Sequence, residues 1–169
     1  MKKIIFLLSL LATLVMADSI VKRTIEIPLS GKPVMFIFDS KTCPYCEKLE
    51  GELNNVTFLK DLAQQFDVYA IARDDHKIYK LFGKDVSTQE LQMSYRVKAT
   101  PNVVIFNKKA EKIFQMPGYI SPLPLSKMLE FTLGVDSGKF QKSDWAKYLY
   151  SNNVTASEKP KSKPKSQQH

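Results

Sequence analysis

The only two cysteines of this 169-residue chain, Cys43 and Cys46, lie in the sequence Thr42-Cys43-Pro44-Tyr45-Cys46-Glu47. A disulfide between them closes a loop too short to restrain the unfolded chain, so it adds little to stability. Exported proteins that use disulfides as structural staples usually spread their cysteines through the sequence. We therefore expect this pair to be present for its chemistry.

Other chemistries of paired cysteines fit this sequence less well. A zinc site needs about four ligands, and besides the cysteines the chain offers only His76 and His169. Haem attachment needs a histidine directly after the second cysteine, where this chain has Glu47. An inert structural disulfide stays an alternative. We expect no metal and no cofactor, and we expect His76 to be a surface residue.

The N-terminus predicts that this chemistry takes place outside the cytoplasm. Lys2 and Lys3 precede an apolar run from Ile4 to Met16, and Ala17 follows it. This pattern is typical of a signal peptide, here residues 1–17 with cleavage after about Ala17. The apolar run is too short to span a bilayer. Because the short Lys-Lys start is typical of bacteria, we expect a soluble protein of the periplasm.

Most of the net charge of +8 lies outside the expected domain. Part of it belongs to the signal peptide. Another part belongs to the segment from Lys159 to His169, which is rich in Lys, Pro and Ser and has no apolar residue. Residues 151–169 are therefore expected to be a disordered tail, and residues 18–150 to form one domain. The remaining lysines alternate with acids and form no aromatic-basic stripe, so we expect no nucleic-acid binding.

Hydrophobic patterns predict alternating strands and helices between the signal and the tail. Pro44 suits a first helical position, so a helix should begin at the cysteine motif. The polar segment Asp74–Val86, with a turn at Gly83, is expected to be an insertion with a short strand near 77–82. Other strands are expected at 20–27, 33–39, 68–72, 102–106 and 111–116, and other helices at 59–66, 88–95, 124–133 and 140–150. This order predicts an α/β fold with a mixed sheet.

Three features in this order make the chain resemble the thioredoxin superfamily over residues 21–134. The strand at 34–38 leads into the CPYC motif, Ala99-Thr100-Pro101 precedes the expected hairpin, and Gly118 follows that hairpin. By this pattern the chain is most similar to periplasmic thioredoxin-like thiol:disulfide interchange proteins. The resemblance implies a thioredoxin-like fold with a central mixed sheet flanked by helices. It also implies that the insertion precedes the third family helix and that the C-terminal helix is an addition.

The residues of the motif can be given roles in thiol exchange. Cys43 is expected to be an exposed thiolate at a helix N-terminus, where free amides and the helix dipole favour negative charge. Cys46, expected to be more enclosed, would resolve the mixed disulfide that Cys43 forms with a substrate. The resemblance implies a cis bond between Thr100 and Pro101, so that the backbone of Thr100 can pair with an extended substrate. The expected substrate-binding residues are Pro44, Tyr45, Thr100, Pro101, Gly118 and Tyr119.

Departures from the thioredoxin pattern narrow the expected activity. Thr42 replaces a tryptophan, and Ile37 stands where thioredoxins bury an acid that assists proton removal, a role for which Asp39 or Glu47 are the substitutes. The Pro-Tyr pair and the threonine before Pro101 resemble periplasmic disulfide reductases and isomerases. Family likeness by itself does not fix function.

We therefore expect a periplasmic thiol-disulfide oxidoreductase, a reductase or isomerase, whose Cys43–Cys46 pair acts on cysteine-containing exported proteins. A membrane electron-donor thiol protein would keep the pair reduced. Because the chain lacks the dimerisation domain of dedicated isomerases, a monomer is expected. Two alternatives remain: an oxidase that introduces disulfides with the same residues, and a non-enzymatic peptide-binding chaperone module that uses the same groove.

Overall fold

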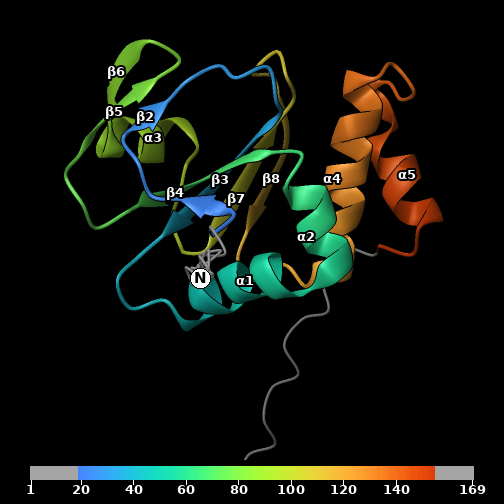
Figure 1. Cartoon of the computed structure of the whole chain (residues 1–169), viewed down its shortest axis with the longest axis horizontal. Coiled ribbons are helices and arrows are strands. Elements are labelled where there is room, and N and C mark those ends of the chain that lie inside the picture. The colour runs from blue at the N-terminus through green and yellow to red at the C-terminus, as the bar shows by residue number, and fades with distance from the viewer. Residues whose placement is uncertain (1–18, 155–169) are drawn as a thin grey trace, which may run out of the picture.

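The central sheet of the computed structural model has five strands in the order β1-β4-β3-β7-β8 (Figure 1). These strands are β1 (Val21–Lys22), β3 (Val34–Asp39), β4 (Asp67–Ala72), β7 (Asn102–Phe106) and β8 (Lys112–Pro117). β1, β4 and β3 are parallel, whereas β3 pairs with β7, and β7 with β8, in antiparallel fashion. The sheet is therefore mixed, and the predicted α/β fold with a central mixed sheet is confirmed.

The structure describes residues 19–154. The predicted signal peptide and the tail beyond Val154 lie outside the described residues. Within 19–154, no helix combines the length and the apolar character needed to cross a bilayer.

The middle strand β3 is buried along its whole length. Successive side chains of a strand point to opposite faces of the sheet, so β3 contributes to the core on both sides. Met35 and Ile37 pack into one hydrophobic cluster and Phe36 and Phe38 into another. This double burial explains why the strand reads as one continuous apolar run instead of an alternating one.

Different elements cover the two faces of the sheet (Figure 1). The first cluster takes side chains from α1 (Pro44–Asn55), α2 (Thr57–Ala63) and α4 (Pro122–Asp136). The second takes them from α3 (Thr88–Ser94) and from the segment that precedes it. The helices predicted at 59–66, 88–95 and 124–133 are thus present. α4 is longer at both ends than its apolar pattern indicated.

The N-terminal segment forms two short strands in two different sheets, so the prediction of one strand over 20–27 is wrong. β1 pairs with β4 of the central sheet, whereas β2 (Glu26–Ile27) pairs with β5 (Ile78–Leu81). The chain bends between them at residues 23–25 and crosses from one sheet to the other.

The predicted insertion is a β-hairpin, and it holds one strand more than expected. β5 pairs with β6 (Lys84–Ser87), and together with β2 they form a three-stranded sheet in the order β2-β5-β6. The turn lies at Gly83, as predicted, with a positive φ of 82°. β6 was not predicted because its sequence is mostly polar and its side chains are exposed or half-buried.

The C-terminal addition packs along α4 (Figure 1). It consists of a 3-10 turn (Lys142–Asp144) and α5 (Trp145–Ser151), which together replace the single helix predicted over 140–150. Phe140 precedes both and stacks on Phe131 of α4, with ring centroids 5.4 Å apart. The described fold continues to Val154, which packs against the core although the prediction placed residues 151–154 in the tail.

Candidate functional site

The cysteine pair lies where β3 ends and α1 begins, as predicted. Cys43 is the N-cap of α1 and Pro44 takes the first position of the helix, where its missing N–H costs no hydrogen bond. The two cysteines form a disulfide, with Cα atoms 5.2 Å apart. The Cys43 sulfur also accepts a hydrogen bond from the backbone N–H of Cys46, at 3.2 Å. The N–H of Cys46 in the first turn of α1 is therefore directed at the sulfur of Cys43.

The two cysteines are equally buried, which corrects the expectation that Cys43 is exposed and Cys46 more enclosed. Cys43 is 6% exposed and Cys46 is 7% exposed in this disulfide form. The reason is local, because the side chain of Cys43 folds over the helix N-terminus to reach both the sulfur and the amide of Cys46.

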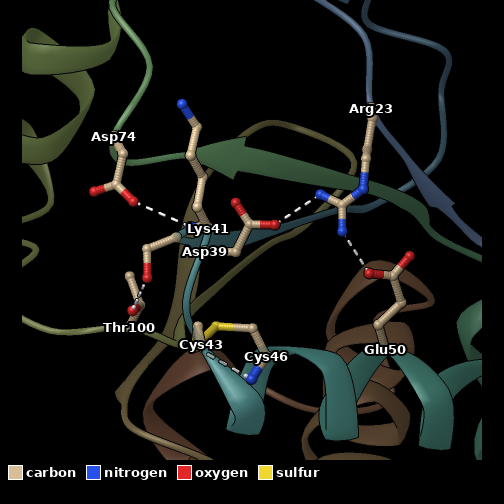
Figure 2. Close-up of a disulfide and its surroundings, with 9 residues drawn as sticks. Arg23, Asp39, Lys41, Cys43, Cys46, Glu50, Asp74 and Thr100 are labelled. Atoms are coloured by element: carbon tan, nitrogen blue, oxygen red, sulfur yellow. Dashed lines mark hydrogen bonds and ion pairs between the residues drawn. A yellow bond between two sulfur atoms is a disulfide. The ribbon is translucent and has the colours of Figure 1, made fainter.

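The segment before β7 lies beside the cysteine pair because of the sheet register. Asn102, the first residue of β7, pairs with Phe38 near the end of β3. The preceding Thr100–Pro101 peptide bond is cis, as the resemblance implied. The Thr100 hydroxyl shares a hydrogen bond of 3.0 Å with the hydroxyl of Ser40 (Figure 2). This bond ties the loop that leads into the cysteine motif to the residue before Pro101.

The two predicted residues after β8 lie next to Pro101 and Tyr45. The Gly118 N–H donates to the Pro101 carbonyl at 2.8 Å, and Gly118 has a positive φ of 90°, which favours glycine. The ring of Tyr119 lies 5.8 Å from that of Tyr45, centroid to centroid. Tyr45 is 60% exposed. These contacts connect four of the predicted substrate-binding residues, of which Tyr45 is exposed, Gly118 and Tyr119 are half-buried and Pro101 is buried.

A carboxylate and a lysine fix the orientation of Tyr119. Its hydroxyl donates to both carboxylate oxygens of Glu52 on α1, at 2.8 and 2.7 Å. Burial, reinforced by this carboxylate, raises the pKa of Tyr119 well above its usual value. The Lys48 ammonium lies 4.6 Å from the ring centroid. Tyr119 is therefore a neutral side chain whose apolar ring is held beside Tyr45.

A cavity of about 350 Å³ borders the disulfide. It is lined by both cysteines, by Asp39 and Ala72 at the ends of β3 and β4, and by Arg23 between the two N-terminal strands. Its lining thus combines the redox pair with charged side chains from segments that are far apart in the sequence.

The buried charge in this cavity belongs to Asp39. Its residue is 9% exposed, and one of its oxygens pairs with Arg23 at 2.7 Å. The same guanidinium pairs with Glu50 at 2.5 Å (Figure 2). Of the two acids considered as substitutes for the thioredoxin acid, Asp39 is therefore buried beside the pair, whereas Glu47 is exposed.

Sequence reasoning missed Arg23, Ser40 and Glu50. Their partners are up to 60 residues away in the chain, as for Ser40 and Thr100, so no local pattern marks them. Asp39 had a detectable signal, since it is a charged residue at the end of an otherwise apolar strand. His76 is exposed, as expected.

Comparisons with known proteins agree with this geometry. A family model described as a thioredoxin-like domain matches residues 21–133. A thioredoxin-fold protein from Helicobacter pylori is similar, with a TM-score of 0.70 and 25% identity over 82% of this chain and 92% of that one.

Two further solved structures share the fold alone. A thioredoxin from Thermus thermophilus has a TM-score of 0.51 and 24% identity over 67% of this chain and 89% of its own. A thioredoxin-like protein from Clostridium perfringens has a TM-score of 0.52 and 19% identity over 74% of this chain and 90% of its own. No curated protein matches the chain. With a match that spans β1 to α4 and a CxxC disulfide at the start of α1, the chain belongs to the thioredoxin-like domain family.

Proposed function

We propose that this protein is a periplasmic thiol-disulfide oxidoreductase, a reductase or isomerase, that acts on cysteine-containing exported proteins. The observation that carries the proposal is the position of the Cys43–Cys46 disulfide at the N-terminus of α1. The amides at that end of a helix stabilise negative charge, and the thiolate is the form of cysteine that attacks disulfides.

The exchange proceeds in two steps. The thiolate of Cys43 attacks a substrate disulfide, an S–S bond forms between Cys43 and the substrate, and the second substrate sulfur leaves with the electron pair and takes up a proton. Cys46 then loses its proton and attacks the sulfur of Cys43, which releases the first substrate sulfur as a thiol. The substrate gains two electrons and two protons, and the Cys43–Cys46 disulfide is formed. The same steps run backwards when the pair acts as an oxidant.

The surface next to the pair suits an extended peptide. Backbone groups of Thr100 stand before a cis proline, where they can pair with a substrate segment. The exposed ring of Tyr45 and the oriented ring of Tyr119 offer an apolar contact to the residues that flank the substrate cysteine.

The proposal also specifies the direction of electron flow and the location of the protein. The Pro-Tyr pair between the cysteines and the threonine before Pro101 support a reductase or isomerase. The signal-like sequence of residues 1–17 supports the periplasm, where a membrane electron-donor thiol protein would reduce the pair. The oxidase and the chaperone module remain the competing functions, and a monomer is the proposed state.

Catalysed reduction of insulin disulfides tests the exchange. We expect Cys43→Ser to abolish it, because the attacking sulfur is lost. We expect Cys46→Ala to retain the first step and to accumulate mixed disulfides, which can be trapped and their protein partners identified. Unchanged insulin reduction by Cys43→Ser would contradict the role given to Cys43. A wild-type protein that reduces no insulin would contradict the proposal and favour the chaperone module.

The redox state of the pair in cells tests the direction. A reductase is held mostly as the dithiol, which alkylation of the free thiols detects as a mass shift. A pool that is mostly disulfide would contradict the reductase and favour the oxidase. Recovery of the mature chain in the periplasmic fraction, with residues 1–17 removed, tests the location.

A further inference from the structure

The carboxylate of Asp39 is an incompletely compensated charge next to the redox pair. One of its oxygens pairs with Arg23 at 2.7 Å. The other, Oδ1, is buried without a hydrogen-bond partner, and it is the only such side-chain nitrogen or oxygen in the part of the chain that the structure describes. A buried acceptor without a partner costs free energy, and Arg23 is the only ion-pair partner of Asp39 among the described residues.

Arg23 divides its charge between two carboxylates. Its two terminal nitrogens contact Asp39 and Glu50 at 2.7 and 2.5 Å, and its side chain is 55% exposed. The hydrogen bond to Asp39 raises the pKa of the Arg23 guanidinium, so Arg23 stays charged. Figure 2 shows the guanidinium between the two acids, with Asp39 on the side of the disulfide.

The remaining charged groups of the cavity are Lys41, Glu47, Glu50, Asp75 and Lys77, which are paired with one another or with Arg23, or lie in solvent. Tyr79 is buried, and because burial raises its pKa it is neutral. Asp75 pairs with Lys77 at 2.8 Å and with Lys41 at 3.6 Å, and Glu47 is exposed. Solvent screens such exposed groups, so their effect on the cysteines is weaker than that of a buried group.

We propose that the Arg23–Asp39 pair sets the redox equilibrium of Cys43 and Cys46, with the two charges acting in opposite directions. This inference rests on the proposed function. When the disulfide is reduced, two electrons enter the S–S bond, Cys46 takes up a proton, and Cys43 becomes a thiolate. A new negative charge therefore appears beside the cavity. Asp39 disfavours that charge and Arg23 favours it.

The proposal predicts the sign of each substitution. Asp39→Asn removes the negative charge and leaves Arg23, so the dithiol form becomes more stable. Arg23→Gln removes the positive charge and leaves Asp39, so the disulfide form becomes more stable. The double variant lies between the two. A purely structural role for the pair predicts no such opposition, because either substitution breaks the same contact.

The equilibrium with glutathione, measured on the full chain at pH 8, tests these signs. We expect Asp39→Asn to shift the equilibrium constant toward the dithiol by about tenfold, or about 30 mV for a two-electron couple. We expect Arg23→Gln to shift the equilibrium constant by a similar factor in the other direction. Arg23→Lys keeps the positive charge and should therefore keep the wild-type value.

A second ion pair from the same N-terminal segment provides the matched control. Lys22 pairs with the buried Asp67 at 2.6 Å, and neither residue lines the cavity. Lys22→Gln and Asp67→Asn should leave the equilibrium unchanged within about twofold. Circular dichroism checks that each variant folds. If Arg23→Gln does not fold, the proposal still requires Asp39→Asn to shift the equilibrium toward the dithiol and Arg23→Lys to keep the wild-type value.

Shifts of the same sign in Asp39→Asn and Arg23→Gln would overturn the inference, as would an equally large shift in Asp67→Asn. In either case a wild-type disulfide that exchanges with glutathione would leave the proposed function intact. A wild-type pair that does not exchange with glutathione at all would overturn both.

Discussion

Replacing Gly134 with alanine should destabilise the fold, although alanine is normally favourable in a helix. Gly134 lies in α4 under the ring of Phe140. A Cβ at this position would lie 2.5 Å from Cε2 of that ring and closer still to Cδ2, well inside the 3.0 Å that real Cβ contacts respect. The ring is stacked on Phe131 at 5.4 Å and contacts Tyr148 at 5.0 Å, so it cannot move without losing aromatic contacts.

The size of the effect follows from two opposing terms. Overpacking of this kind costs about 1–3 kcal/mol. Replacing a helical glycine with alanine returns up to about 1 kcal/mol. We expect Gly134→Ala to lower the free energy of unfolding by up to about 2 kcal/mol, because the overpacking term is the larger.

Urea unfolding followed by circular dichroism measures this change, with the m-value expected to stay constant. Gly51 of α1 is the control, because nothing lies within 4 Å of the Cβ it would carry. Gly51→Ala should therefore stabilise the protein by about 0.5–1 kcal/mol. In a Phe140→Ala background, Gly134→Ala should become stabilising too. If Gly134→Ala stabilises the otherwise wild-type chain, Phe140 does not pack on α4 as described.

Three further predictions concern ionisable groups and a helix cap. Burial opposes ionisation of Asp67, but the hydrogen bonds from Lys22 and Ser30, together with the charge of Lys22, outweigh it and hold the pKa of Asp67 below its usual value. The stability that Asp67 adds is therefore present above about pH 4 and lost as the pH falls further, so in acid the free energies of unfolding of wild type and Asp67→Asn should converge. Ser87→Ala removes the capping box of α3 and should cost about 1 kcal/mol in urea unfolding. Burial is the main cause that raises the pKa of Tyr148 to about 12, and the hydrogen bond and charge of Glu130 add to it. An absorbance titration should therefore show a lower pKa of Tyr148 in Glu130→Gln.

The parts of the fold that could be predicted from the sequence are those with strong local signals. β3, β4 and β7 are continuous apolar runs, and such runs mark strands buried on both faces. The start of α1 was marked by Pro44, because proline fits the first turn of a helix.

The parts that could not be predicted depend on distant partners. β6 is held by its pairing with β5, and its polar sequence carries no strand signal. The break between β1 and β2 follows from their pairing with two different strands, which the sequence of 20–27 does not reveal.

The candidate site divides in the same way. The cysteine pair could be predicted because it forms a compact motif, whereas the cis Thr100–Pro101 bond was implied by the resemblance to the thioredoxin superfamily. The burial of Cys43 could not, since it depends on the direction in which its side chain turns. The contact of Arg23 with Asp39 joins the bend between β1 and β2 to the end of β3, and only the folded structure brings these two side chains together.

The pairing of β1 and β2 has a consequence for the order in which the chain is made. Val21 pairs with Val68 and Glu26 with Lys80. Neither strand can pair until the ribosome has added its partner, about 50 residues later. At typical rates of translation that delay lasts several seconds. Cys43 and Cys46 likewise leave the ribosome before the segment around Pro101 exists. The nascent chain thus carries two thiols through its synthesis before the segment that lies beside them in the folded protein has been made.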